Sequence, residues 1–101
     1  MYLQKLVPAT TDRKVLAFEY DGKARLVEPH AVGINKKGEA VMRGFQFTGD
    51  SATSASAWKL FTVSKMEALT ILDMISHAPR PGYKAGDKAM SEILAELAEA
   101  A

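Results

Sequence analysis

The stretch VLAFEYDG, from Val15 to Gly22, decides the fold of this chain. Within it Leu16, Phe18 and Tyr20 alternate with smaller or polar residues, which is the period of a strand with one apolar face. The pair Asp21-Gly22 follows directly. It favours a tight type I′ hairpin turn, because both central residues of that turn need positive φ. The stretch therefore predicts a strand and the start of an antiparallel hairpin.

The same signals continue along the chain. A second strand is expected over 23–28, and Pro29, which has no N–H, marks a strand end, an edge or a bulge. A third strand is expected over 39–48. A small polar loop over 49–56 then leads to a fourth strand over 57–63.

The segment 64–75 carries two conflicting patterns. Ser64 and Glu67 have the spacing of a capping box, which favours a helix. Leu69, Thr70 and Ile71 favour a fifth strand. Local pattern alone leaves both alternatives open.

Helices are expected at the two ends of the chain. Residues 1–7 predict a short helix that Pro8 ends. Residues 77–82 contain two prolines and predict a rigid linker. After the N-cap candidate Asp87, four apolar residues fall at helical spacing and predict a closing amphipathic helix. These four are Met90, Ile93, Leu94 and Leu97.

The elements together predict a mainly β fold with flanking helices, a small and strongly bent antiparallel barrel. We expect one domain, in which 1–76 form the barrel and the short first helix. Residues 77–101 supply the linker and the last helix. Closing the sheet into a barrel would remove its exposed edges.

Composition narrows the classes of function. The 101 residues include no cysteine, so disulfides and thiolate zinc sites are excluded and a cytoplasmic setting is expected. No apolar stretch approaches the roughly 18 residues of a membrane span. The net charge is +1, but residues 13–65 carry nine basic against five acidic side chains. An anionic ligand on this basic part is one interpretation, and chance asymmetry of a solvated surface is the other.

Catalytic and metal-binding patterns are missing from the sequence. His30 and His77 lack the further convergent ligands that a metal site needs. The serines of loop 49–56 have no nucleophile-elbow pattern around them, and Glu28 has no second acid–base group beside it. We therefore expect neither an enzyme nor a cofactor.

Four motifs together resemble the WYL domain family, whose fold is an SH3/Sm-like β-barrel. They are Phe18-Glu19-Tyr20-Asp21-Gly22, Arg25-Leu26-Val27-Glu28-Pro29-His30, the run from Arg43 to Ser51, and Trp58-Lys59-Leu60-Phe61. The resemblance covers roughly residues 15–72. It implies that 64–75 form a turn and a strand. It also implies a ligand-sensing or regulatory module, free-standing and of the phage or prophage kind, that contacts nucleic acid or a nucleotide.

The candidate ligand-binding residues are the basic side chains of the matched region and one aromatic. They are Arg25, Arg43, Lys59, Lys65 and Tyr20. Arginine suits phosphate because its guanidinium donates two parallel hydrogen bonds, and an aromatic ring stacks on a base. If they converge, they form one basic face for single-stranded nucleic acid or a nucleotide. Alternatively, Arg43 points inward and holds a buried carboxylate such as Glu28.

A protein–protein interaction module is the alternative function. In this interpretation the chain binds a protein partner or forms a homodimer, through an edge strand or through the apolar stripe that begins at Met90. Trp58 and Phe61 are expected to fill the core rather than to bind a ligand.

Overall fold

The computed structural model describes residues 2–48 and 57–99, so the predicted loop 49–56 lies outside the described residues. The fold is mainly β, as predicted: six antiparallel strands, one α-helix and one 3₁₀ turn make up the described part. The elements are α1 (Leu3–Thr11), β1 (Lys14–Tyr20), β2 (Lys23–Ile34), β3 (Ala40–Thr48), β4 (Trp58–Thr62), η2 (Val63–Lys65), β5 (Glu67–Ile75) and β6 (Glu92–Glu96).

The hairpin of β1 and β2 is confirmed. Asp21 and Gly22 have φ of 52° and 75°, the positive values that the predicted turn requires. The register places Phe18 opposite Arg25 and Leu16 opposite Val27. Because directly opposed residues of an antiparallel pair share a face, Arg25 lies on the same face as the core residues. Leu26, which lies opposite Ala17, is on the other face.

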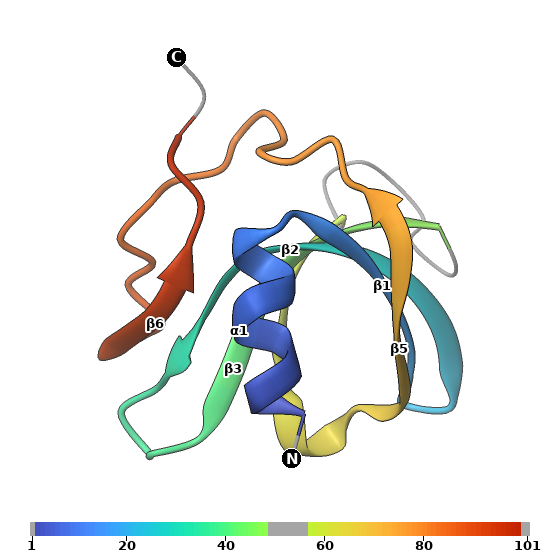
Figure 1. The fold of residues 1–101 in the computed structure, drawn as a ribbon. Helices are drawn as coiled ribbons and strands as arrows, with labels where there is room; N and C mark the ends of the chain where they lie inside the picture. Colours follow the sequence, from blue (N-terminus) through green and yellow to red (C-terminus); the bar gives the residue numbers. More distant parts are fainter. Residues whose placement is uncertain (1, 49–56, 100–101) are drawn as a thin grey trace.

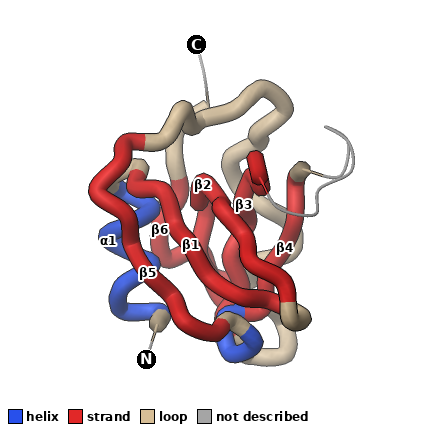
Figure 2. The backbone as a smooth tube through the Cα atoms, turned by 90° about the vertical axis from the view of Figure 1, so that its right-hand side faces the viewer, coloured by secondary structure: helices blue, strands red, loops and turns tan. Residues whose placement is uncertain are grey.

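Strand β2 is twice as long as predicted and organises the sheet. It runs through Pro29, and its register with β3 shifts between Pro29 and Ala31, as at a bulge. Its first half pairs with β1 and its second half with β6, while β3 pairs along most of its length. The strand order is β4-β3-β2-β1-β5, which ends in two free edges. The sheet is curved and open, so the closed barrel is not confirmed (Figure 2).

Helix α1 lies across the curved sheet and covers its concave side (Figure 1). It buries Leu6, Ala9 and Thr10 against the core. The helix continues past Pro8, where the sequence had predicted its end. The hydroxyls of Thr10 and Thr11 donate to carbonyls one turn back, on Leu6 and Val7, and so extend the last turn. The main core holds Leu16, Phe18, Val27, Val32, Met42, Phe61, Val63 and Met66.

The segment 64–75 forms η2 and β5, as the family resemblance implied. Strand β5 pairs with β1 and forms one edge of the sheet. The predicted turn and strand are therefore confirmed over this segment.

The predicted C-terminal helix is wrong. Residues 77–91, here called the strap, cross one end of the sheet and lead into β6 (Figure 1). Strand β6 pairs with Ala31–Ile34 of β2, where β1 has already left β2. Met90 and Leu97 are buried, but Ile93 and Leu94 are 36% and 38% exposed. The four residues therefore do not form one apolar stripe. The free hydrogen-bonding edge of β2 outweighs the local helical spacing.

Candidate functional site

A buried carboxylate fastens the strap to the sheet. Glu28 on β2 is 1% exposed, and Arg80 of the strap binds it with two hydrogen bonds. The distances are 2.6 Å from Nε to Oε1 and 3.2 Å from Nη2 to Oε2. The backbone N–H of His77 also donates to Oε2, at 3.0 Å. We call Glu28 and Arg80 the latch, because this pair joins two segments that are 52 residues apart in the chain.

The latch keeps both partners charged. Burial raises the pKa of the Glu28 carboxyl, but the hydrogen bonds from Arg80 and His77 and the charge of Arg80 outweigh burial, so this pKa is lowered. The hydrogen bond to Glu28 raises the pKa of Arg80. The alternative interpretation of the sequence paired Glu28 with Arg43. Its partner is instead Arg80.

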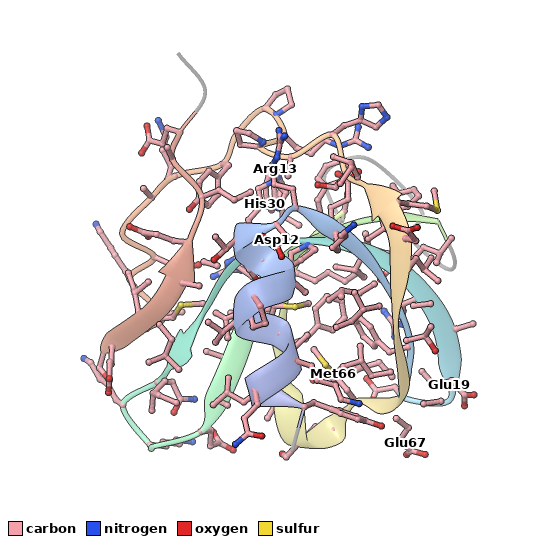
Figure 3. All side chains as sticks on the ribbon, in the orientation of Figure 1. Asp12, Arg13, Glu19, His30, Met66 and Glu67 are labelled. Atoms are coloured by element: carbon pink, nitrogen blue, oxygen red, sulfur yellow. The ribbon has the colours of Figure 1, made fainter. Side chains whose placement is uncertain are left out.

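His30 supports the latch as a neutral, buried ring. Its Nε2 accepts a hydrogen bond from the backbone N–H of Arg80 at 2.9 Å, so its proton lies on Nδ1 and is donated to the carbonyl of Glu28. Burial lowers the pKa of the His30 imidazole. The ring also packs against Trp58 and Tyr83, with centroids 4.7 and 5.1 Å away. Figure 3 shows His30 inside the fold, close to the strap.

Arg43 binds the second half of the strap, at Asp87. It points to the strap and binds Asp87, with Nε 2.7 Å from Oδ2 and Nη2 3.3 Å from Oδ1. This hydrogen bond lowers the pKa of Asp87. Asp87 also accepts from the backbone N–H of Ala89. Arg43 therefore holds a carboxylate, as the alternative interpretation proposed, but the carboxylate is Asp87 and not Glu28.

A second polar group lies on the opposite, core side of the sheet. Arg25 donates from Nη1 to Oε1 of Gln46 at 3.0 Å and from Nη2 to the carbonyl of Tyr20 at 3.1 Å. Its guanidinium lies 5.7 Å from the centre of the Tyr20 ring. Lys59 is paired with Gly44 on the same face as Phe61 and Met42. We call Tyr20, Arg25, Gln46 and Lys59 the Arg25 cluster.

The Arg25 cluster contains more hydrogen-bond donors than acceptors. Gln46 is 1% exposed, and its only side-chain acceptor, Oε1, is used by Arg25. Among the described residues, neither Nε of Arg25 nor Nε2 of Gln46 has a partner, although both atoms are buried. Burying a donor without an acceptor costs about 1–3 kcal/mol. The cluster therefore needs a further hydrogen-bond acceptor, and residues 2–48 and 57–99 do not supply one.

The five predicted ligand residues do not form one face. Tyr20, Arg25 and Lys59 share the core side of the sheet, whereas Arg43 lies on the strap side. Lys65 is exposed on η2. Gln46 was missed because a glutamine in a strand has no distinguishing pattern. Arg80 and Tyr83 were missed because their partners Glu28 and His30 lie about 50 residues earlier in the chain.

Residues 2–48 and 57–99 contain neither a cluster of metal ligands nor a helix that could span a membrane. No three His, Asp or Glu side chains gather there as a metal site would need. The part of the chain that the structure describes also contains no helix with the length and apolar character to cross a bilayer.

The comparisons with known proteins identify no relative. No family model matches the chain, and neither a curated protein nor a solved structure is significantly similar to it.

Proposed function

We propose that this protein is a non-enzymatic binding module for a phosphate-bearing ligand, a nucleotide or single-stranded nucleic acid, held at the Arg25 cluster. The observation that carries the proposal is the pair of buried donors without an acceptor, Nε of Arg25 and Nε2 of Gln46. A phosphate group offers several acceptor oxygens to such donors. A ligand-sensing or regulatory role is compatible with binding and requires no catalytic group.

The positive charge and the aromatic ring of the cluster favour a nucleotide as the ligand, rather than an uncharged molecule that offers only a hydrogen-bond acceptor. Arg25 and Lys59 bring two positive charges to one face, and Lys59 has no ion pair with any residue that the structure describes. Tyr20 is half-buried beside Arg25, and its hydroxyl accepts the N–H of Thr62, which fixes the ring. Fixed aromatic rings next to cations are the usual elements of single-strand recognition.

Side-chain NMR tests this function directly. The chain has three side-chain amide groups, on Gln4, Asn35 and Gln46, and four arginines, so their signals are easily separated. We expect a thymidylate oligonucleotide to shift the Gln46 amide and the Arg25 Nε–H signals. The signals of Gln4 and Asn35 serve as internal controls and stay in place. The apparent affinity decreases as salt increases, since phosphate contacts release counterions.

A pair of variants separates binding from folding. Arg25→Lys keeps the charge but removes the fork, and we expect a loss of roughly 10- to 100-fold in affinity for a lost charge-assisted contact. Lys36→Ala, in the exposed turn between β2 and β3, is the matched control and keeps full affinity. An unshifted Gln46 amide with every phosphate ligand at low salt would contradict the proposal.

A protein–protein interaction module remains the second candidate, and one observation favours it. Ile71, Met74 and Ile75 of the edge strand β5 are 37%, 53% and 57% exposed. Three large apolar side chains on a free edge favour pairing with another chain. A tagged protein that recovers only nucleic acid would speak against this candidate.

A further inference from the structure

The strap forms one wall of an open pocket on the side of the sheet opposite the Arg25 cluster. Its volume is about 550 Å³, which lies within the usual range of 300–1,000 Å³ for small-molecule sites. Arg43 and Trp58 form the sheet side of this pocket, and strap residues 82–88 form the other side. Below it is called the strap pocket.

An indole ring forms one wall of the strap pocket. Trp58 is half-buried, and three neighbouring rings hold it in place. Its centroid lies 5.3 Å from Phe45 and 4.7 Å from His30, both edge-on, and 6.3 Å from Tyr83, which stacks at 23°. Tyr83 is in turn fixed, because its hydroxyl donates to the carbonyl of Leu97 at 2.7 Å. The wall is therefore a rigid aromatic surface, suited to a flat ring.

The rest of the lining is positive. Arg43, Lys84 and Lys88 contribute three cations to the lining, against one carboxylate, Asp87. Asp87 is already bound by Arg43 and by the N–H of Ala89. Lys84 and Lys88 have no hydrogen bond or ion pair with any residue in 2–48 or 57–99. The pocket thus combines free positive charge with an aromatic wall.

Two further carboxylates, Glu96 and Glu99, approach the strap and keep their negative charge, but neither forms an ion pair with a lysine of the pocket in the described residues. Glu99 accepts the backbone N–H of Ala85 at 2.9 Å, and Glu96 accepts that of Gly86 at 2.9 Å. These bonds hold the strap backbone from β6 and from the residues after it. They leave Lys84 and Lys88 without a carboxylate partner in the described part of the chain.

From these observations we infer that the strap pocket is a second binding site, for a small anion that carries a flat ring. The ring stacks on Trp58 and the anionic group contacts Lys84 and Lys88. An aromatic carboxylate and a nucleoside monophosphate share this chemistry. The inference does not depend on the Arg25 cluster, because no residue belongs to both sites.

Trp58 fluorescence tests the inference, since Trp58 is the only tryptophan of the chain. Four probes are titrated: adenosine monophosphate, benzoate, adenosine and inorganic phosphate. We expect saturable quenching by a probe that has both ring and charge, with at least about tenfold weaker effects of adenosine and phosphate. Benzoate against adenosine monophosphate then decides between a carboxylate and a phosphate ligand. Equal quenching by adenosine and its monophosphate, or no saturable quenching by any probe, overturns the inference.

Two matched double variants test whether the anionic group of the ligand binds at Lys84 and Lys88. Lys84→Ala with Lys88→Ala should weaken the binding of the effective probe about tenfold, because two charge contacts are lost. Lys36→Ala with Lys37→Ala removes the same charge from the exposed turn between β2 and β3 and should leave the affinity unchanged. An equal loss in both variants would show unspecific attraction and would also overturn the inference. Thermal melts of both variants check that the fold is intact.

The two sites are tested by separate signals. The Gln46 amide reports on the Arg25 cluster, and Trp58 reports on the strap pocket. A failure of one test therefore leaves the result of the other intact.

Discussion

Glu28 accepts three of the hydrogen bonds that hold the strap. Its carboxylate accepts from Arg80 and His77, and its carbonyl accepts from His30. A buried ion pair adds little net stability compared with an apolar pair, since both ions lose their hydration. Removing one partner is different, because the other charge then stays in the interior without compensation. The latch is therefore sensitive to single substitutions.

Glu28→Gln should destabilise the protein by about 3 kcal/mol. The substitution removes the buried carboxylate that neutralises Arg80, so the arginine keeps its charge without an ion-pair partner. For a chain of this size we expect a decrease in Tm of more than about 10 °C. Asp73→Asn is the control, since Asp73 pairs with Lys14 at the surface and is fully exposed. Its Tm should stay at the wild-type value. Equal melting of all three proteins would show that the latch does not hold the strap.

Acid should weaken the same region in two steps. The folded-state pKa values of His30 and Glu28 are both lowered, so each contributes stability above its ordinary pKa and loses it as the pH falls through the lowered one. Urea unfolding should show decreasing stability below about pH 6.5, from His30, and a further decrease below pH 4.5, from Glu28. In Glu28→Gln the second step should be smaller. Stability that rises between pH 7 and pH 4 would contradict both assignments.

At the level of elements, the sequence predicted correctly those strands and turns that depend on neighbouring residues. The alternation in β1 and the Asp-Gly turn need no distant partner, and both are confirmed. The spacing of Met90, Ile93, Leu94 and Leu97 predicted a helix, but the segment pairs as β6 with a strand about 60 residues earlier. A local sequence pattern cannot reveal this pairing, because strand β2 lies too far away in the chain.

The candidate sites follow the same rule. Arg25 was proposed because of the resemblance, and its position beside Tyr20 is known only from the structure. Gln46 and Arg80 were not found, because their importance depends on what lies across the sheet. Glu28 was noticed but was given the wrong partner, since Arg80 reaches it only after the chain has crossed the sheet.

Gly33→Ala should detach β6 from β2. A Cβ at this position would overlap the carbonyl oxygen of Glu92 and would lie 2.8 Å from the sulfur of Met90. The backbone contact cannot relax without opening the ladder, and we expect a loss of about 2–3 kcal/mol.

Hydrogen exchange checks this prediction. The N–H of Ser91, which donates to Ile34, should exchange faster in the variant, while the amides between β1 and β2 stay protected. Gly38→Asn is the control, because Gly38 has φ of +82° with open space around it and asparagine tolerates that conformation. Unchanged protection of Ser91 in Gly33→Ala would contradict the close approach.

For the whole molecule, the open sheet leaves β5 as a free edge that exposes apolar side chains. Edge strands are normally blunted by lysine or proline, and β5 (EALTILDMI) has neither. Met74→Lys combined with Ile75→Lys should therefore abolish self-association and leave Tm unchanged, since both side chains are more than half exposed. Sedimentation over a range of concentrations measures the first effect. A wild-type protein that is monomeric at every concentration would remove the homodimer from consideration.

The latch has a consequence for synthesis on the ribosome. Glu28 leaves the exit tunnel with β2 long before Arg80 does, because the chain emerges from its N-terminus. Until Arg80 is free, the emerging sheet would have to bury a carboxylate without its counter-ion, which is too costly for a stable structure. We expect that ribosome-bound chains ending before Arg80 stay sensitive to protease, and that resistance begins only once the strap has been released into solution.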